Sequence, residues 1–198
     1  MNKKILVTGG SGFLGSHVCE RLNISTGEVM SFVAPRSKEY DLRKNTDTQV
    51  LFSDFKPNVV IHLAATCGGI QANQRNPGKY FYDNMLMGMN IIEQSRLHNV
   101  DKFIFVSTVC AYPKHCKVPF MEYDIWKGYP EETNAPYGIA KKSLQVMLDA
   151  YNREYGLKSI TLIPANLYGP NDNFDDKKSH VIPALIKKIY DAQQNDED

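Results

Sequence analysis

Short apolar runs alternate along the chain with segments in which apolar residues recur every three or four positions. The short runs are typical of strands that are covered on both faces, and the periodic segments are typical of amphipathic helices. This pattern predicts five strands, at Lys4–Thr8, Val29–Ala34, Val59–Leu63, Phe103–Ser107 and Ser159–Pro164. It predicts five helices, at Gly15–Leu22, Thr48–Phe55, Pro77–His98, Pro136–Tyr155 and Ile182–Gln193.

The regular alternation of strand and helix indicates how these elements assemble. Strands that are separated by helices join a parallel sheet through crossover connections, with helices on its faces. We therefore expect an α/β fold with a doubly wound parallel sheet of the Rossmann type. Gly156 is expected to end the helix before it, and the polar residues Gln193–Asp198 are expected to fray.

A glycine-rich segment joins the first predicted strand to the first predicted helix. Glycines at 9, 12 and 15 permit a tight turn, close approach of the backbone to a diphosphate, and close packing of the helix on the strand. The helix N-terminus adds N–H donors and a partial positive charge. An ordinary βα turn is the alternative, but the position in an alternating chain favours dinucleotide binding. The residues concerned are Gly9, Gly10, Ser11, Gly12, Phe13, Leu14 and Gly15.

The end of the second predicted strand bears on which nicotinamide cofactor binds. Sites for NAD usually place an Asp or Glu there, where it binds the ribose 2′-hydroxyl. This strand runs instead into Ala34-Pro35-Arg36-Ser37, which contains no acid. The guanidinium of Arg36 suits a 2′-phosphate, although a solvated loop arginine is the alternative. The sequence favours NADP(H) over NAD.

Tyr137 and Lys141 form a YxxxK pair on a predicted helix. Residues four apart share one helix face, so the ammonium is expected to lie near the phenol and to lower its pKa. An exposed pair without function is the alternative. Upstream, Ser107 and Thr108 end a predicted strand, where open α/β sheets place their ligands, and Thr108 could bond a substrate carbonyl. Glycine loop, Thr, Tyr and Lys together are typical of the short-chain dehydrogenase/reductases.

Composition and charge narrow the choice of partners. The 198 residues suffice for one domain with a substantial core but are few for two. A formal net charge of +1 without clustered Lys and Arg indicates no nucleic-acid or anionic-membrane partner. The apolar runs are too short for a signal peptide or for the roughly 18 residues of a membrane span. Four cysteines without a CxxC pair predict a reduced, cytoplasmic protein and no metal site.

Longer segments carry a more specific resemblance, which runs from the first strand nearly to the end of the chain. The segments are HLAA (62–65), CGGI (67–70), VCAYPK (109–114), TNAPY (133–137), NLYGPNDNF (166–174) and SHVIPAL (179–185). In these the chain resembles the GDP-L-fucose synthases, which are extended short-chain dehydrogenase/reductases. That family epimerises GDP-4-keto-6-deoxy-D-mannose at C3 and C5 and reduces C4 with NADPH. The resemblance therefore implies conversion of this GDP-linked sugar to GDP-L-fucose.

The resemblance also implies roles for the matched residues. A 4-keto group acidifies the C–H bonds at C3 and C5, so epimerisation needs a base and an acid on opposite faces. Cys110 resembles the family's base and His180 its acid, while Tyr137 would protonate O4 as hydride reaches C4. Lys141 would hold the ribose, and Thr108 stands for the family's usual serine. Further cofactor contacts are expected from Leu63, Ala64, Ala65, Ser107, Pro164, Ala165, Asn166 and Leu167.

Some features depart from the family pattern. Lys188 lies where the family tends to have a substrate-contacting arginine, so a point charge replaces a bidentate fork. Ser11 replaces a basic residue that is common in the family's glycine loop. Family members continue further than this chain, which implies a mostly missing C-terminal substrate domain. We expect an NADP-binding, catalytic domain at 1–170 and the start of an incomplete substrate-binding region at 171–198.

Three functions remain open from the sequence. The first is the epimerase/reductase activity. The second is another nucleotide-sugar epimerase or dehydratase, although a dehydratase is expected to have an acidic pair where Val109 and Cys110 stand. The third is a non-enzymatic NADP-binding fragment that needs a partner subunit. The helices predicted at 77–98 and 136–155 resemble those of the superfamily's four-helix dimer interface, so we also expect a homodimer.

Overall fold

A five-stranded parallel sheet forms the centre of the protein. The computed structural model describes residues 3–25, 30–175, 179 and 181–195. All four neighbouring strand pairs are parallel, in the order β2-β1-β3-β4-β5, and the crossover between β2 and β3 reverses the direction of winding. The strands are β1 (Lys3–Thr8), β2 (Met30–Val33), β3 (Val59–His62), β4 (Lys102–Val106) and β5 (Ser159–Leu162).

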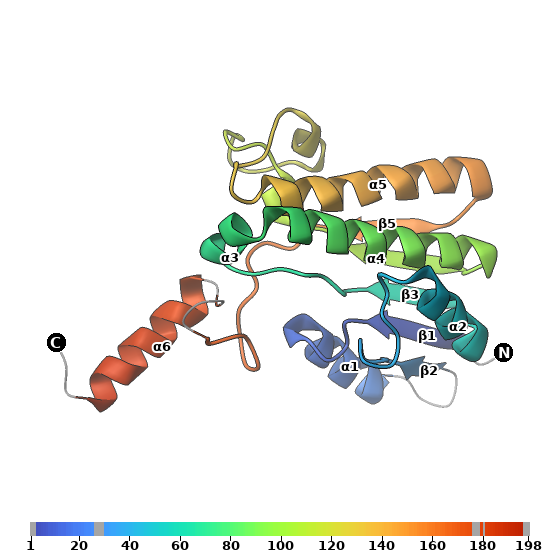
Figure 1. Cartoon of the computed structure of the whole chain (residues 1–198), viewed down its shortest axis with the longest axis horizontal. Coiled ribbons are helices and arrows are strands. Elements are labelled where there is room, and N and C mark those ends of the chain that lie inside the picture. Colours follow the sequence, from blue (N-terminus) through green and yellow to red (C-terminus); the bar gives the residue numbers. More distant parts are fainter. Residues whose placement is uncertain (1–2, 26–29, 176–178, 180, 196–198) are drawn as a thin grey trace.

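Helices cover both faces of the sheet, which confirms the doubly wound Rossmann arrangement. Helices α2, α4 and α5 lie on one face and α1 on the other (Figure 1). Short 3₁₀ helices η1 (Val109–Ala111) and η2 (Glu122–Trp126) follow β4. The α-helices are α1 (Phe13–Ser25), α2 (Asn45–Phe55), α3 (Ile70–Arg75), α4 (Pro77–Leu97), α5 (Ala135–Tyr155) and α6 (Val181–Gln194).

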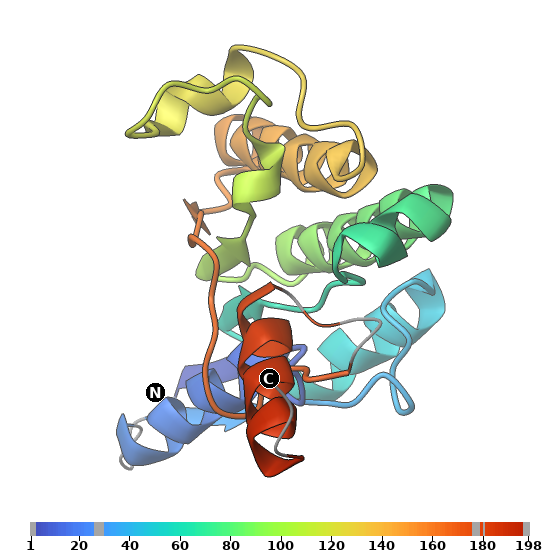
Figure 2. The same cartoon turned by 90° about the vertical axis from the view of Figure 1, so that its left-hand side faces the viewer.

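The two long helices α4 and α5 lie side by side, with α4 against β3 and α5 against β5 (Figures 1 and 2). Each has a proline in its first turn, where the missing N–H costs no hydrogen bond. The last turn of α5 ends at Gly156, whose φ of 72° is the left-handed conformation that glycine adopts without strain. The start of each helix and the end of α5 therefore follow from local sequence signals.

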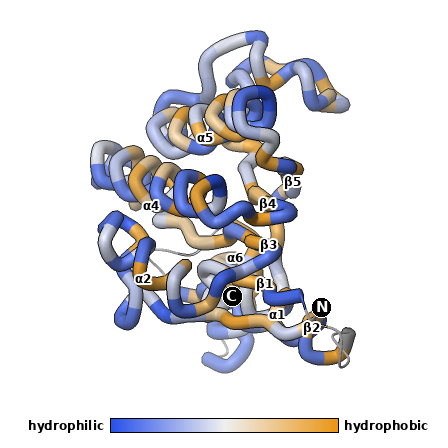
Figure 3. The backbone as a smooth tube through the Cα atoms, turned by 90° about the vertical axis from the view of Figure 1, so that its right-hand side faces the viewer, coloured by the Kyte–Doolittle hydropathy of each residue, from blue (hydrophilic) through white to orange (hydrophobic). Residues whose placement is uncertain are grey.

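The hydrophobic core lies between the sheet and these helices. Phe103 and Phe105 of β4 are fully buried, and Leu144 and Leu148 of α5 pack against the same cluster. Figure 3 shows apolar residues concentrated in the strands and in the helix faces that meet them. The opposite face of β5 is different, because Ile160 and Leu162 are exposed there. The core thus lies on the face of the sheet that α4 and α5 cover.

The element boundaries differ from the prediction in a few places. Helix α2 begins three residues earlier than predicted, and α1 extends to Ser25. Helix α3 was not predicted, because six residues after a glycine pair carry too little periodicity to be recognised. Helix α6 forms as predicted but stands apart from the sheet, with Val181, Leu185 and Ile189 exposed (Figure 1). The predicted domain boundary at residue 170 stays a prediction.

Candidate active site

The glycine loop lies where β1, β2 and β3 end, at the point where the direction of winding reverses. Gly9 has a φ of 74°, and a Cβ there would lie 2.7 Å from the Ala64 backbone nitrogen. A Cβ on Gly15 would lie 2.1 Å from the Gly9 carbonyl oxygen. The loop closes with a hydrogen bond from the Gly12 N–H to that same carbonyl, 3.0 Å long. Only glycine fits these two positions, as a backbone cradle for a diphosphate requires.

Buried polar groups hold the β3 end of this cradle. The Thr8 hydroxyl is hydrogen-bonded to His62 Nδ1 at 2.7 Å and accepts the Ala64 N–H at 3.3 Å. His62 is fully buried against Phe105, and this burial lowers its pKa to about 3, with a further contribution from the charge of Lys141. A neutral imidazole therefore fixes Thr8, which in turn fixes Ala64. The predicted contacts at Leu63, Ala64 and Ala65 thus border the glycine loop.

Arg36 lies in a turn just after β2, and its side chain is exposed. Its backbone N–H donates to the Glu39 carboxylate at 2.8 Å, and its carbonyl accepts the Glu39 N–H at 2.9 Å. Both bonds fix the backbone at Arg36, and neither of them involves its guanidinium. Gly10 meets the same strand end, since a Cβ there would lie 2.6 Å from the Ala34 Cβ. Arg36 is thus placed beside the loop, as a contact to an adenosine ribose would require.

Tyr137, Thr108 and Cys110 come together where η1 meets the first turn of α5. The Thr108 hydroxyl accepts the Cys110 N–H at 3.2 Å and lies close enough to the Tyr137 phenol to act on its pKa. Gly138 permits the close approach, because a Cβ there would lie 2.3 Å from the Cys110 carbonyl oxygen. These three residues therefore lie together at the end of β4, and their catalytic roles stay predictions.

Lys141 is almost completely buried beneath this cluster. Its Nζ donates to the Val106 carbonyl at 3.0 Å and lies 5.0 Å from the centre of the Phe105 ring. Burial lowers the pKa of Lys141 to about 8, although the Cys67 thiol acts in the opposite direction. The Ser107 hydroxyl at the same strand end is buried without a hydrogen-bond partner in the described part of the chain.

The expectation that Lys141 lowers the pKa of Tyr137 is wrong for this structure. Burial raises the pKa of the phenol above its usual value, and the thiols of Cys67 and Cys110 raise it further. Thr108 opposes these effects only in part. The Lys141 ammonium donates to the Val106 carbonyl and is not among the groups that shift the pKa of the phenol. A protonated phenol at neutral pH is therefore the favoured state.

Sequence reasoning assigned no role to three residues that border Tyr137. Cys67 is exposed as a residue, but burial on its inner side raises the pKa of its thiol, which lies close enough to Tyr137 and Lys141 to act on their pKa values. Asn73 of α3 is buried and donates to the Asn134 side chain immediately before α5, at 3.1 Å. The segment CGGI pointed to this region, but no local signal indicated which elements its residues would contact.

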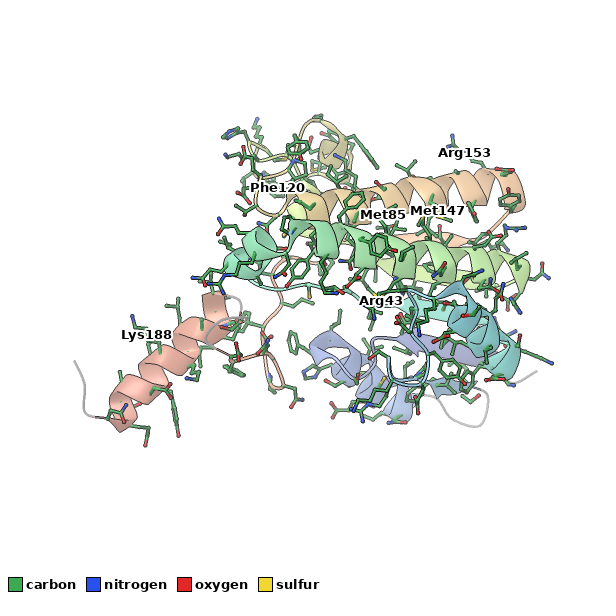
Figure 4. The ribbon with its side chains drawn as sticks, viewed as in Figure 1. Arg43, Met85, Phe120, Met147, Arg153 and Lys188 are labelled. Atoms are coloured by element: carbon green, nitrogen blue, oxygen red, sulfur yellow. The ribbon has the colours of Figure 1, made fainter. Side chains whose placement is uncertain are left out.

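The remaining predicted residues lie elsewhere or outside the described residues. His180 is outside them, so its position beside the site stays a prediction. Lys188 lies on α6, which stands away from the sheet and from the ends of its strands, so the structure does not bring it into the site (Figure 4). The segment after β5, with Pro164, Ala165, Asn166 and Leu167, continues to Pro170, whose carbonyl is 2.8 Å from His17 Nε2 on α1. It therefore passes over the helix that follows the glycine loop.

Metal centres and membrane-spanning segments are two other kinds of feature on which the described residues bear. Among the described residues, no group of three or more His, Cys, Asp or Glu side chains is placed to hold a metal ion. The described helices also include none with the length and hydropathy of a membrane-spanning segment.

Comparison with known proteins gives consistent matches over nearly the whole chain. The sequence profile of the NAD dependent epimerase/dehydratase family matches residues 5–197. GDP-L-fucose synthase of Sinorhizobium fredii is 39% identical over 98% of this chain, and GDP-L-colitose synthase of Yersinia pseudotuberculosis is 38% identical over 96%. The chain spans 61% of the length of each of these relatives. A GDP-L-fucose synthetase structure from Naegleria fowleri bound to NADP superposes with a TM-score of 0.90 at 33% identity, covering 99% of this chain and 64% of that one.

Proposed function

Because the chain belongs to the NAD dependent epimerase/dehydratase family, we propose that it carries the NADP-binding and catalytic part of an epimerase/reductase. The proposed reaction converts GDP-4-keto-6-deoxy-D-mannose to GDP-L-fucose. The observation that carries this proposal is the grouping of Thr108, Cys110 and Tyr137 above the buried Lys141. A reductase needs only a proton donor near the carbonyl, whereas an added thiol suits proton abstraction beside it.

The glycine loop fits a dinucleotide. Its turn is so close to Ala64 and Ala34 that side chains at Gly9 and Gly10 would collide with them, and α1 begins at Phe13 directly behind it. Backbone N–H groups at that helix end suit the diphosphate. When bound, NADPH supplies the hydride for C4. Arg36 beside the loop and the NADP in the structure of the N. fowleri relative both support NADP(H) over NAD.

The proposed proton transfers follow from the protonation states of the site. Tyr137 is proposed to donate its proton to O4 as the carbonyl is reduced, and burial holds the phenol in its protonated form until then by raising its pKa. Thr108, whose hydroxyl acts on the pKa of the phenol, is proposed to orient it. Cys110 lies on η1, the short 3₁₀ helix that Thr108 caps, and is proposed to remove the acidified protons at C3 and C5. His180 is proposed to return protons from the other face.

Two alternatives have specific support. The family includes other nucleotide-sugar enzymes, and the GDP-L-colitose synthase of Y. pseudotuberculosis is almost as similar as the fucose synthase. A cofactor-binding fragment that needs a partner subunit is supported by the position of Lys188, which α6 holds away from the site.

We also propose a cytoplasmic homodimer that forms through α4 and α5. Phe81 and Tyr82 of α4 and Val146 of α5 are exposed, on helices that already pack side by side. Apolar side chains on two adjacent helices form the kind of surface that a four-helix interface buries. Sedimentation is expected to show a dimer at micromolar concentration, and a clean monomer would contradict this part of the proposal.

The experiment that tests the proposed function follows NADPH oxidation by the pure chain in the presence of GDP-4-keto-6-deoxy-D-mannose. We expect loss of the reduced nicotinamide absorbance, and we expect Tyr137→Phe to abolish it. The matched control is Tyr129→Phe, which removes a phenol that is largely exposed at 66%. NADPH binding without oxidation by the unaltered chain would favour the fragment alternative.

A further inference from the structure

The carboxamide of Asn73 joins two segments that are 61 residues apart in the sequence. Its side chain is buried, with 5% of the residue exposed. Its Nδ2 lies 2.9 Å from the Gly68 carbonyl, 3.3 Å from the Gly69 carbonyl and 3.1 Å from Asn134 Oδ1. One amide group with two hydrogens is therefore shared among three acceptor oxygens.

The Asn134 end of this connection is rigid. Asn134 donates both its backbone N–H and its Nδ2 to the Glu131 carboxylate, at 3.2 and 3.0 Å. Its carbonyl accepts the Gly138 N–H at 2.8 Å, which makes Asn134 the cap of α5. Tyr137 lies in the helical turn that this bond closes. A displacement of Asn134 would therefore move the phenol with it.

The other end holds the turn that presents Cys67. Thr66, before it, is bound on both sides by Asn84, which accepts the Thr66 N–H at 3.1 Å and donates to its carbonyl at 2.8 Å. Gly68, after it, fits closely, because a Cβ there would lie 2.9 Å from the Tyr80 hydroxyl. The backbone at Cys67 is thus fixed from both directions, close to Tyr137.

Resting on the proposed function, we infer that Asn73 is a positioning residue for the reaction. Its carboxamide ties the turn at Cys67–Gly69 to the cap of α5, and so fixes the Tyr137 hydroxyl relative to the wall of the substrate site. Asn73 contacts no reacting atom in this scheme. It acts by setting the distance between the turn at Cys67–Gly69 and the cap of α5. Displacements of about 1 Å at a reacting centre can reduce rates by roughly a hundredfold.

The sharpest test replaces the amide donor with an acid of the same shape, Asn73→Asp. At pH 8 the carboxylate faces three acceptor oxygens with no hydrogen to donate, so the link to Asn134 is lost. We expect kcat for NADPH oxidation to fall roughly tenfold to a hundredfold, with the Kd for NADPH unchanged within about twofold. Asn76→Asp is the matched control, because Asn76 is exposed and its Nδ2 donates to the nearby Ala72 carbonyl.

The pH dependence separates this role from a merely structural one. As the pH falls toward 6, the carboxyl of the variant regains an O–H that can donate to Asn134, since nearby carbonyl oxygens raise its pKa. The gap in kcat between variant and unaltered chain is therefore expected to narrow. The groups that face the carboxyl keep their charge over this range. Hydrogen bonds from Thr133 hold the pKa of Glu131 below its usual value, and burial raises the pKa of the Cys67 thiol, which therefore stays neutral.

A second readout does not require turnover. The alkylation rate of Cys67 by iodoacetamide, mapped by mass spectrometry, is expected to rise several-fold in Asn73→Asp at pH 8 relative to the unaltered chain. If the unaltered chain oxidises no NADPH, the proposed function fails, and the alkylation rates alone decide whether the link exists. Unchanged alkylation together with unchanged kcat would overturn the inference. A fall in kcat that matches the unfolded fraction and persists at pH 6 would also overturn it.

Discussion

Gly15 offers a direct test of the glycine loop as a cofactor cradle. Gly15→Ala adds a single Cβ, which would lie 2.1 Å from the Gly9 carbonyl oxygen and 2.6 Å from the Gly10 Cα. Both neighbours are backbone atoms of the loop, so neither can move by a change of rotamer. Since carbon atoms pack at about 3.5–4.0 Å, the loop must withdraw by roughly 1 Å or more. The N–H groups that face the diphosphate move with it.

The expected magnitudes follow from the loop's two roles. Overpacking costs about 1–3 kcal/mol, and alanine in a helix recovers up to about 1 kcal/mol, so stability falls by up to about 3 kcal/mol. For a chain of this size, Tm then falls by up to roughly 12 °C. Losing one or two hydrogen bonds to a charged diphosphate costs about 1.5–3 kcal/mol, which weakens NADPH binding roughly tenfold to a hundredfold.

The assay is a titration of NADPH fluorescence, combined with thermal melts. Gly78→Ala is the matched control, because Gly78 lies in the first turn of α4 and a Cβ there would have no neighbour within 4 Å. This control is expected to bind NADPH like the unaltered chain and to be equally or slightly more stable. Binding by Gly15→Ala within about twofold of the unaltered chain would refute the reasoning.

Three further changes test the cofactor contact, the buried charge and the core. Arg36→Ala is expected to weaken NADPH binding roughly tenfold to a hundredfold and leave NADH binding unchanged; Arg153→Ala, at the far end of α5, should alter neither (Figure 4). Lys141 has a folded pKa of about 8, so the unfolded chain binds more protons between pH 8 and 10.5, and stability should rise with pH there. Thermal melts of Lys141→Met should lack this rise. Gly88→Ala would place a Cβ 2.2 Å from the Leu144 Cδ1, so it should cost about 1–3 kcal/mol in urea unfolding. Its cost should shrink when combined with Leu144→Ala, and additive costs would contradict the contact.

Much of the fold could be predicted because its signals are local. The apolar runs of β1, β3 and β4 and the periodicity of α4 and α5 each lie within one element. Gly156 ended α5 as expected, since left-handed backbone favours glycine wherever it occurs. Helix α3 escaped prediction because it is short and is held by contacts with α4 and the preceding turn.

The site could be predicted only in part, because its details depend on contacts between distant segments. The spacing of Tyr137 and Lys141 placed both on one helix face, but it gave no sign that the Val106 carbonyl would bind the ammonium. The pKa of Tyr137 was therefore predicted in the wrong direction. The bond between Asn73 and Asn134 likewise joins two turns whose approach no local pattern encodes.

The central claim is that one site both exchanges protons at C3 and C5 and reduces C4. The measurement that tests it most directly is the NMR spectrum of the product formed from GDP-4-keto-6-deoxy-D-mannose in D₂O with unlabelled NADPH. If Cys110 and its proposed partner acid exchange protons with solvent while hydride reaches C4, the product should carry deuterium at C3 and C5 and hydrogen at C4. A reduced product with hydrogen at both C3 and C5 would show a simple reductase and would contradict the account.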